Sequence, residues 1–317
     1  MSQPRMIESF CLEICQRTLR GEHRFLQTKE LQDMITYDLG HVCTTTETEV
    51  HAGVFMATHY HLMVTVKTML SVAAFTRELN SLLARTTNRS QDEIGQFWCR
   101  EAPQVTPVPP DQVYDRMGYI LGNPTSAGVA VTSSEHAGVI FGPADIGRTF
   151  VAKRPDHALG KGTELPLEAK LTVTAPKLLI GEEPVEEFQA KVAQLVEEHE
   201  AKVLAEFKRA GKTPPSKHTM EQRIAERWER REWKYVAPDE DEKARERISK
   251  GGPPRFFAKG AEAVQREERR QAKFQALYRA AMREYHDDPF AVVEFPHGTL
   301  LMSGDPRVVV SAERIEV

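Results

Sequence analysis

Short apolar runs alternate with helical patterns along the first half of the chain. Residues 10–14 alternate apolar and polar side chains, as in a strand with one buried face. Residues 28–46 have the pattern of a helix that opens at a threonine, which is a favourable N-cap residue. Residues 49–57 and 60–66 follow as two further strands, with His59 at their junction.

Residues 71–88 predict a second helix. Ser71 is its expected N-cap, and apolar side chains recur behind it at helical spacing. Residues 96–98 read as a short strand, and the prolines at 107–110 as a turn before a last helix from Asp111. This order of elements predicts an α+β fold of ferredoxin-like type, an antiparallel sheet with helices packed on it.

The character of the chain changes after the first domain, which we expect at residues 1–155. Residues 156–317 are rich in charge and read as three helical stretches separated by turns at 211–215 and 251–254, with a strand and turn at 292–300. The first stretch carries one apolar stripe, formed by Val185, Phe188, Val192, Leu195, Val196, Val203, Leu204 and Phe207. The stripe needs a partner surface, which is a neighbouring helix, the first domain or a second subunit. A homodimer and the role of this region are left open.

Length and composition limit the classes of protein to which the chain can belong. At 317 residues the chain is long enough for two domains. Its apolar runs are far shorter than the roughly 20 residues of a membrane span, and its N-terminal segment lacks the pattern of a secretory signal. We therefore expect a cytoplasmic protein with no membrane segment. The four cysteines form no CxxC pair, which favours reduced thiols. A net charge of −4 gives no overall attraction to nucleic acid, so DNA binding would depend on local patches.

The sequence His59-Tyr60-His61 is the first candidate for chemistry. Two histidines separated by one residue on a strand point to the same face, because side chains alternate along a strand. Imidazole is the commonest protein metal ligand, so this pair can form two corners of a metal site. The alternative is a polar edge of a sheet with no ligand.

Tyr119 and Asn123 are the second candidate. They are four residues apart in a segment with helical character, so a continuing helix would place the phenol and the carboxamide on one face. Pro124 disfavours a helical conformation at Asn123 and predicts an irregular last turn. The alternative is a surface helix that simply ends at Asn-Pro.

Four segments together carry a resemblance to a known family. They are GVFMATHYHLMV around the histidine pair, FTRELNSLLARTTNR and GQFWCRE after it, and GYILGNPTSAGVA around Tyr119. In content and order, over residues 8 to about 130, they resemble the REP-associated tyrosine transposases of the single-tyrosine HUH superfamily. VVEFPHGTLLM near the C-terminus is similar to long-tailed members, less specifically. Two departures are Thr58, where relatives often carry Asn, and Thr125-Ser126, where a hydrophobic and a basic residue are usual.

The resemblance implies an HUH nuclease domain in which Tyr119 is the nucleophile and His59, His61 and Asn123 are the metal ligands. It implies a transposase-like endonuclease and strand transferase that acts on single-stranded DNA with hairpin repeats, through a 5′-phosphotyrosine intermediate. It also implies Mg or Mn as the metal and a prokaryotic, nucleoid-associated location. Imidazole chemistry leaves zinc as the competing metal.

Candidate DNA contacts follow the histidine strand, on the expected second helix: Arg77, Arg85, Asn88 and Arg89. A solvated helix face is the alternative for these side chains. Residues 223–235 interleave arginine with tryptophan, a pattern that suits single-stranded or hairpin DNA. Acidic residues are as dense there, which favours an ordinary amphipathic helix.

Two other functions remain open from the sequence. One is a domesticated protein that binds DNA hairpins without cutting them. The other is an unrelated metal-dependent hydrolase that uses the histidine pair and a bound water. The target DNA and the mobility of the element are not specified by these residues.

Overall fold

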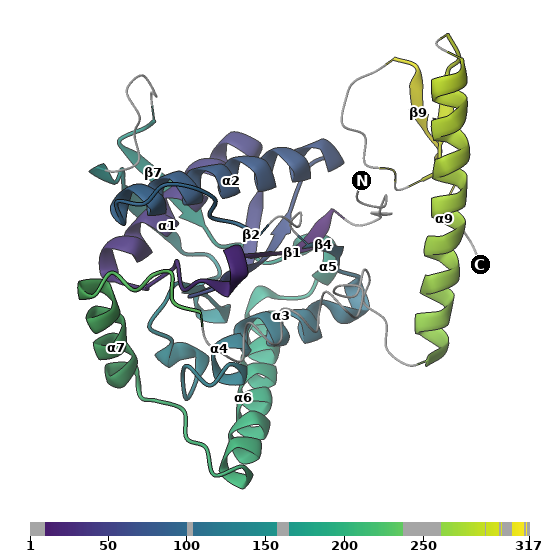
Figure 1. Cartoon of the computed structure of the whole chain (residues 1–317). Coiled ribbons are helices and arrows are strands. Elements are labelled where there is room, and N and C mark those ends of the chain that lie inside the picture. The colour runs from purple at the N-terminus through teal and green to yellow at the C-terminus, as the bar shows by residue number, and fades with distance from the viewer. Residues whose placement is uncertain are drawn as a thin grey trace.

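A computed structural model of the chain describes residues 10–99, 104–156, 165–236, 261–288, 290–297, 299, 306–313 and 315 (Figure 1). The strands are β1 (Cys11–Arg17), β2 (Glu49–Met56), β3 (His59–Thr65), β4 (Gln104–Pro107), β5 (Ile140–Phe141), β6 (Thr149–Lys153), β7 (Glu168–Thr172), β8 (Val293–Phe295) and β9 (Val308–Val310). The α-helices are α1 (Lys29–Thr46), α2 (Met69–Ser90), α3 (Val113–Leu121), α4 (Asn123–Ser126), α5 (Lys177–Ile180), α6 (Val185–Arg209), α7 (Lys217–Glu229) and α9 (Ala261–Asp287).

The central sheet has five strands in the order β4-β1-β3-β2-β5, and every neighbouring pair is antiparallel. The strand β1 pairs with β3 along its whole length, from Cys11 opposite Thr65 to Arg17 opposite His59. This confirms the predicted mixture of helices with an antiparallel sheet. The histidine pair lies wholly within a strand, since β3 begins at His59.

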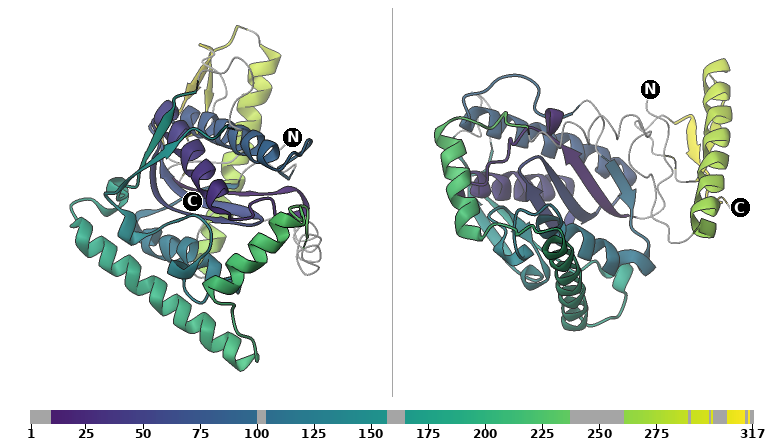
Figure 2. Two further views of the ribbon diagram at one scale, coloured as in Figure 1. Left: turned by 90° about the vertical axis from the view of Figure 1, so that its left-hand side faces the viewer. Right: turned by 60° about the horizontal axis from the view of Figure 1, so that its bottom comes forward.

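Helices cover both faces of this sheet (Figure 2). The helices α1 and α2 lie on one face, where Tyr60 donates a 2.8 Å hydrogen bond from its hydroxyl to Oδ1 of Asn80 in α2. Inward-facing residues of this layer include Leu12, Ile14 and Leu62, which are fully buried. The helices α3 and α6 lie on the other face, and α3 contacts β2 and β3. The sheet is therefore the middle layer of three.

The start of α1 agrees with the sequence, and the start of α2 does not. Thr28 caps α1, and its hydroxyl accepts from the backbone N–H of Leu31 at 3.2 Å. The cap of α2 is Thr68, whose hydroxyl accepts from the N–H of Ser71 at 3.2 Å. Ser71 is therefore not the N-cap, because the helix begins two residues earlier and Ser71 lies in its first turn.

The strand expected at residues 96–98 is also wrong. Only one isolated bridge forms there, between Thr18 and Trp98, and the edge strand is β4. The apolar character of this segment comes from ring packing, because Phe97 and Trp98 both contact Phe25, at centroid distances of 5.3 and 5.7 Å. These two rings therefore hold a loop against Phe25 and are not part of a strand.

Residues beyond the expected boundary at 155 pack on the first domain. The strands β6 and β7 form a hairpin whose two halves lie on either side of that boundary, and both contact α1. A Cβ at Gly40 of α1 would lie 3.0 Å from the backbone carbonyl of Lys170 in β7, so this close approach depends on glycine. The stripe of α6 packs against α3 and α4, which selects the first domain from the three expected partner surfaces.

The C-terminal part has its own small core. The helix α9 packs on β8 through a cluster that includes Ala281, Val293 and Phe295, and β8 pairs with β9 in parallel. The expected turn at 211–215 lies between α6 and α7, with Gly211 at a φ of +66°. The expected turn at 251–254 lies outside the described residues. Across the described part of the chain, no helix has an apolar stretch long enough to cross a membrane.

One carboxyl is buried between α1 and α2. Asp38 is 1% exposed, and burial raises its pKa from an ordinary value of 3.8 to about 8, with Thr86 and Arg85 offsetting only part of the effect. Folding therefore makes this group bind its proton more tightly. Its contribution to the free energy of unfolding is largest below about pH 4 and declines as pH rises towards 8.

We expect Asp38→Asn to stabilise the protein at pH 8 by roughly 1–3 kcal/mol, because the amide removes a buried charge. At pH 4 the variant and the wild type should differ little, since Asn resembles the protonated carboxyl in shape. Urea unfolding between pH 4 and 8 measures this, with the exposed Asp33→Asn on the same helix as control. A stability difference that does not change with pH would contradict the assignment.

Candidate functional site

The two histidines lie on the face of the sheet that α3 covers. Alternation along β3 sends Tyr60 to the α2 face and both imidazoles to the other, where their ring centroids are 5.1 Å apart. His59 is 9% and His61 is 7% exposed. The polar-edge alternative does not describe this strand, because β3 lies in the middle of the sheet between β1 and β2.

Each imidazole has a hydrogen bond at Nδ1. His61 Nδ1 lies 2.9 Å from Oε1 of Glu13 in β1, and His59 Nδ1 lies 2.9 Å from the hydroxyl of Thr58. A partner at Nδ1 orients each ring, and Nε2 is the nitrogen with which these rings would bind a metal ion. The Sγ of Cys15 lies 3.7 Å from Nε2 of His61, so a thiol borders the same position.

Glu13 and His61 form a buried charged pair. Burial lowers the pKa of His61, but Cys15 and Glu13 outweigh that effect and raise it to about 9. Burial raises the pKa of Glu13, but the hydrogen bonds and charges of His61 and Arg116 outweigh it and lower the value. Both pKa shifts favour the charged forms, an imidazolium beside a carboxylate.

Tyr119 reaches the histidines from α3. Its ring lies edge-on to His61, with centroids 5.7 Å apart, and the side chain remains 47% exposed. The guanidinium of Arg116 lies over the Tyr119 ring, 4.3 Å from its centroid. Burial and the charge of Glu13 raise the pKa of Tyr119, while Arg116 and a hydrogen bond from Asn123 offset this in part. The phenol is thus accessible but needs activation to react as a phenolate.

Asn123 stays beside Tyr119 through a break in the helix. The helix α3 ends at Leu121, and α4 begins at Asn123. Gly122 between them keeps helical dihedrals, and its carbonyl accepts from the N–H of Ser126 at 3.0 Å. The irregular turn expected from Pro124 is present, yet the chain path continues, so the spacing of four residues still places the amide near the phenol.

The helix α6 supports this segment from outside. Phe188 packs on Tyr114 of α3, with ring centroids 5.3 Å apart. His199 accepts or donates a 2.8 Å hydrogen bond with the hydroxyl of Ser126. A Cβ at Gly122 would lie 2.4 Å from Cδ2 of His199, so the helices approach closely only because this residue is glycine.

The residues present suit a divalent ion with open coordination positions. Two imidazoles and a carboxamide oxygen are a mixed donor set, and phosphate or water oxygens would complete it. Within the described ranges, no three His, Cys, Asp or Glu side chains form a ready metal-binding group. Asn123, whose side chain hydrogen-bonds Tyr119, is the residue that would supply an oxygen donor beside the two imidazoles.

The candidate DNA contacts on α2 lie on the opposite face of the sheet from the histidines. Arg77 lies 3.8 Å from Glu78, and Arg85 donates to a carbonyl of its own helix. Asn88 accepts a 2.5 Å hydrogen bond from the buried Arg24. Arg89 lies in the last turn of the same helix. The structure brings His59, His61 and Tyr119 together and places Asn123 beside Tyr119, but it does not bring the four α2 residues to this site.

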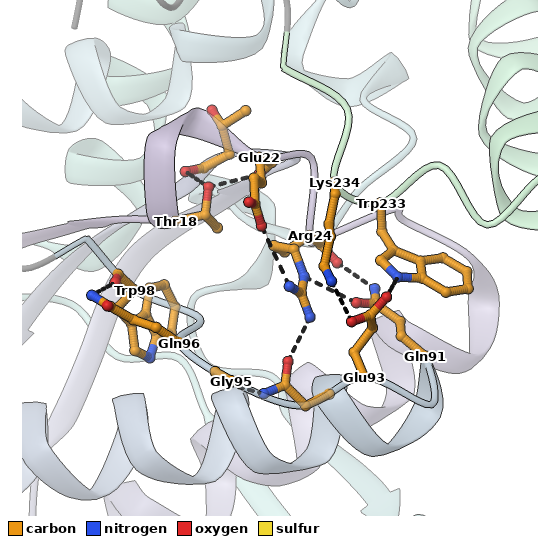
Figure 3. Close-up of polar contacts among 12 residues, drawn as sticks. Thr18, Glu22, Arg24, Gln91, Glu93, Gly95, Gln96, Trp98, Trp233 and Lys234 are labelled. Carbon is orange, nitrogen blue, oxygen red and sulfur yellow. Dashed lines mark hydrogen bonds and ion pairs between the residues drawn. The ribbon is translucent and has the colours of Figure 1, made fainter.

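The segment at residues 223–235 folds back on the first domain (Figure 3). The indole N–H of Trp233 donates to Oε1 of Glu93 at 3.0 Å, and Lys234 lies 2.5 Å from the other oxygen. Arg227 contacts His23 at 2.5 Å. These aromatic and basic side chains are engaged with the protein itself, as the amphipathic-helix alternative expects.

Four residues near the histidines were missed from the sequence. Glu13, Cys15 and Arg17 lie on the histidine face of β1, with Cys15 opposite His61 and Arg17 opposite His59, and Arg116 joins them from α3. A signal existed, because polar side chains at alternating positions of an otherwise apolar strand indicate a functional face. The partner strand of β3 could not be identified from one sequence.

Comparisons of the chain with protein-family models, with curated proteins and with solved structures gave no match.

We expect Gly122→Ala to destabilise the protein by roughly 1–3 kcal/mol, because the added methyl overlaps the ring of His199. The same substitution should cost less in a His199→Ala background, where space is available. Urea unfolding of the four variants gives the coupling energy. Gly142→Ala is the matched control, since its Cβ would meet only an ordinary contact at 3.9 Å. Equal costs in both backgrounds would contradict the close packing.

Proposed function

We propose that this protein is a metal-dependent, transposase-like endonuclease and strand transferase for single-stranded DNA, acting through a 5′-phosphotyrosine intermediate. The observation that carries the proposal is the contact between Tyr119 and His61, two groups 58 residues apart in sequence whose rings lie 5.7 Å apart. An exposed phenol beside two buried imidazoles is an unusual arrangement for a purely structural site. It suits a nucleophile that meets a large substrate at a metal.

The fold supports the proposal. Apart from a 3-10 turn at Leu19–Gly21, the first six elements of the domain are β1, α1, β2, β3, α2 and β4, and these four strands lie in the order β4-β1-β3-β2, with β5 added beside β2. This order supports the ferredoxin-like fold that we propose and that the resemblance to HUH transposases implies. In that arrangement the histidine pair belongs on the central strand β3, and the tyrosine belongs on a helix that crosses the open face.

The chemistry is a phosphoryl transfer. The Tyr119 hydroxyl loses its proton and its oxygen attacks the phosphorus. The bond from phosphorus to the 3′-oxygen breaks, and that oxygen takes up a proton from solvent to leave as the 3′-hydroxyl. The product is a 5′-phosphotyrosyl link, so one phosphodiester replaces another and strand transfer needs no ATP. When bound at His59, His61 and Asn123, a divalent ion supplies Lewis acidity at a phosphate oxygen. The chain itself orients the phenol through Arg116 and Asn123.

We propose Mg or Mn as the metal, following the resemblance. The contact of Cys15 with Nε2 of His61 is a specific observation in favour of the zinc alternative, because thiols select softer ions. For the substrate, Arg17 and Arg116 lie on the Tyr119 face and are better placed for phosphates than the arginines of α2. The proposed partner remains single-stranded DNA with hairpin repeats, in a prokaryotic, nucleoid-associated setting.

We expect a covalent protein–DNA adduct when labelled hairpin-forming single strands from the host's flanking repeats are incubated with Mn or Mg. Tyr119→Phe and His59→Ala should each abolish it on denaturing gels, because one removes the nucleophile and the other a ligand. Tyr235→Phe is the matched control, because the ring of this phenol contacts His23 and Arg227. Binding in native gels with no adduct in the wild type would instead support a DNA-hairpin-binding protein. Metal-dependent turnover that survives Tyr119→Phe would support the hydrolase.

Metal affinity should rise with pH by up to tenfold per unit between pH 7 and 9. The reason is that His61, with its pKa raised to about 9, must lose a proton before Nε2 can bind the ion. Calorimetry in buffers of different ionisation enthalpy measures both the affinity and the proton released. Tyr119→Phe should show the same dependence. An affinity that is flat over this range would exclude His61 as a ligand.

A further inference from the structure

Glu13 has two carboxylate oxygens with two different partners. Oε1 accepts from Nδ1 of His61 at 2.9 Å, and Oε2 accepts from Nη2 of Arg116 in α3. The residue is 5% exposed and lies on β1, which carries neither histidine nor the tyrosine. The carboxylate is therefore shared between the central sheet and the helix above it.

Arg116 continues the connection to the nucleophile. Its guanidinium lies over the ring of Tyr119, at 4.3 Å from the centroid, and the two residues are three apart on one helix. A cation over an aromatic face restrains the ring, and it does so more strongly when the cation is removed from water. The Arg116 side chain is 16% exposed, so this condition holds. A continuous path thus runs from His61 through Glu13 and Arg116 to Tyr119.

Fold stability alone gives little reason for this arrangement. A buried charged pair is often no more stabilising than apolar residues of the same volume, because the charges lose their hydration. A plain structural pair would also place both oxygens of Glu13 on the guanidinium, which is the strongest geometry for arginine. Here one oxygen is used for the imidazole. The use of one oxygen for His61 and the other for Arg116 suits a residue that orients both of these side chains.

We infer that Glu13 is a positioning residue that holds His61 by one oxygen and Tyr119, through Arg116, by the other, so that metal ligand and nucleophile keep one relative geometry. This inference rests on the proposed function. It predicts different effects for the loss of Glu13 and for the loss of Arg116. Loss of Glu13 disturbs both the metal ligand and the tyrosine, whereas loss of Arg116 disturbs the tyrosine alone.

The test is made on the full-length chain labelled with 3-fluorotyrosine. The chain has seven tyrosines, and the resonance of Tyr119 is assigned by its loss in Tyr119→Phe. Fluorine NMR then reports the surroundings of Tyr119, and calorimetry reports the affinity for Mg or Zn alone, so neither readout needs catalysis. The other tyrosine resonances show whether each variant is folded.

Glu13→Gln should weaken metal binding by about 10–100-fold, as is usual for the carboxylate partner of a ligating histidine, and should move the Tyr119 resonance. Arg116→Gln should move the same resonance and leave metal affinity within about threefold. In the double variant the Tyr119 shift should equal that of Arg116→Gln, because both act through one path. Glu47→Gln, at an exposed carboxylate paired with Lys67, should change neither readout.

Three results would overturn the inference. They are an unmoved Tyr119 resonance in Glu13→Gln, an unmoved one in Arg116→Gln, and equal losses of metal affinity in the two variants. If Glu13→Gln does not fold, Arg116→Gln still decides the case through its Tyr119 shift and unchanged affinity. If the wild type binds no metal, the proposed metal dependence is wrong. The fluorine shifts would still test the connection from Glu13 to Tyr119.

Discussion

The register between β1 and β3 is the constraint on which the candidate site depends. It places Cys15 opposite His61 and so brings Glu13, two residues earlier on the same face, to the Nδ1 atom of that imidazole. Because side chains alternate along a strand, a slip of one residue would turn these polar groups towards the α1–α2 layer. Apolar residues on that layer, such as Leu12 and Ile14, oppose such a slip, since it would expose them to the polar face.

The candidate site combines buried side chains of the sheet with an exposed side chain of the helix layer that covers it. The sheet supplies groups that are buried and hydrogen-bonded, and α3 supplies a phenol that is half exposed. The phenol is open to solvent, while hydrogen bonds at Nδ1 hold the buried imidazoles in one orientation. The position of α3 depends in turn on α6, whose stripe packs on it, and on the absence of a side chain at Gly122. A charged helix from the second half of the chain thus forms part of the support of the site.

The loop after β1 shows why a basic residue is not always a nucleic-acid contact. Arg24 is 1% exposed, and Gln91, Asn88 and Glu22 accept from its guanidinium (Figure 3). This buried cation joins the N-terminal loop to the end of α2, and the segment after α7 closes over it through Glu93. Polar side chains with partners of this kind serve the fold, because leaving them unpaired would cost several kcal/mol.

The sequence by itself determined the first three strands and the first helix. Alternation gave β1 to β3, and the Thr28 cap and helical period gave α1. Local spacing made His59, His61, Tyr119 and Asn123 candidates, and the resemblance to a known family selected them over the alternatives. Tertiary structure alone decided which strands pair and which face each helix covers. It therefore decided the contact of Glu13 with His61 and Arg116 and the position of α2 away from the site. Those features depend on contacts across 48 to 103 residues, and local propensity carries no information about such distant pairings.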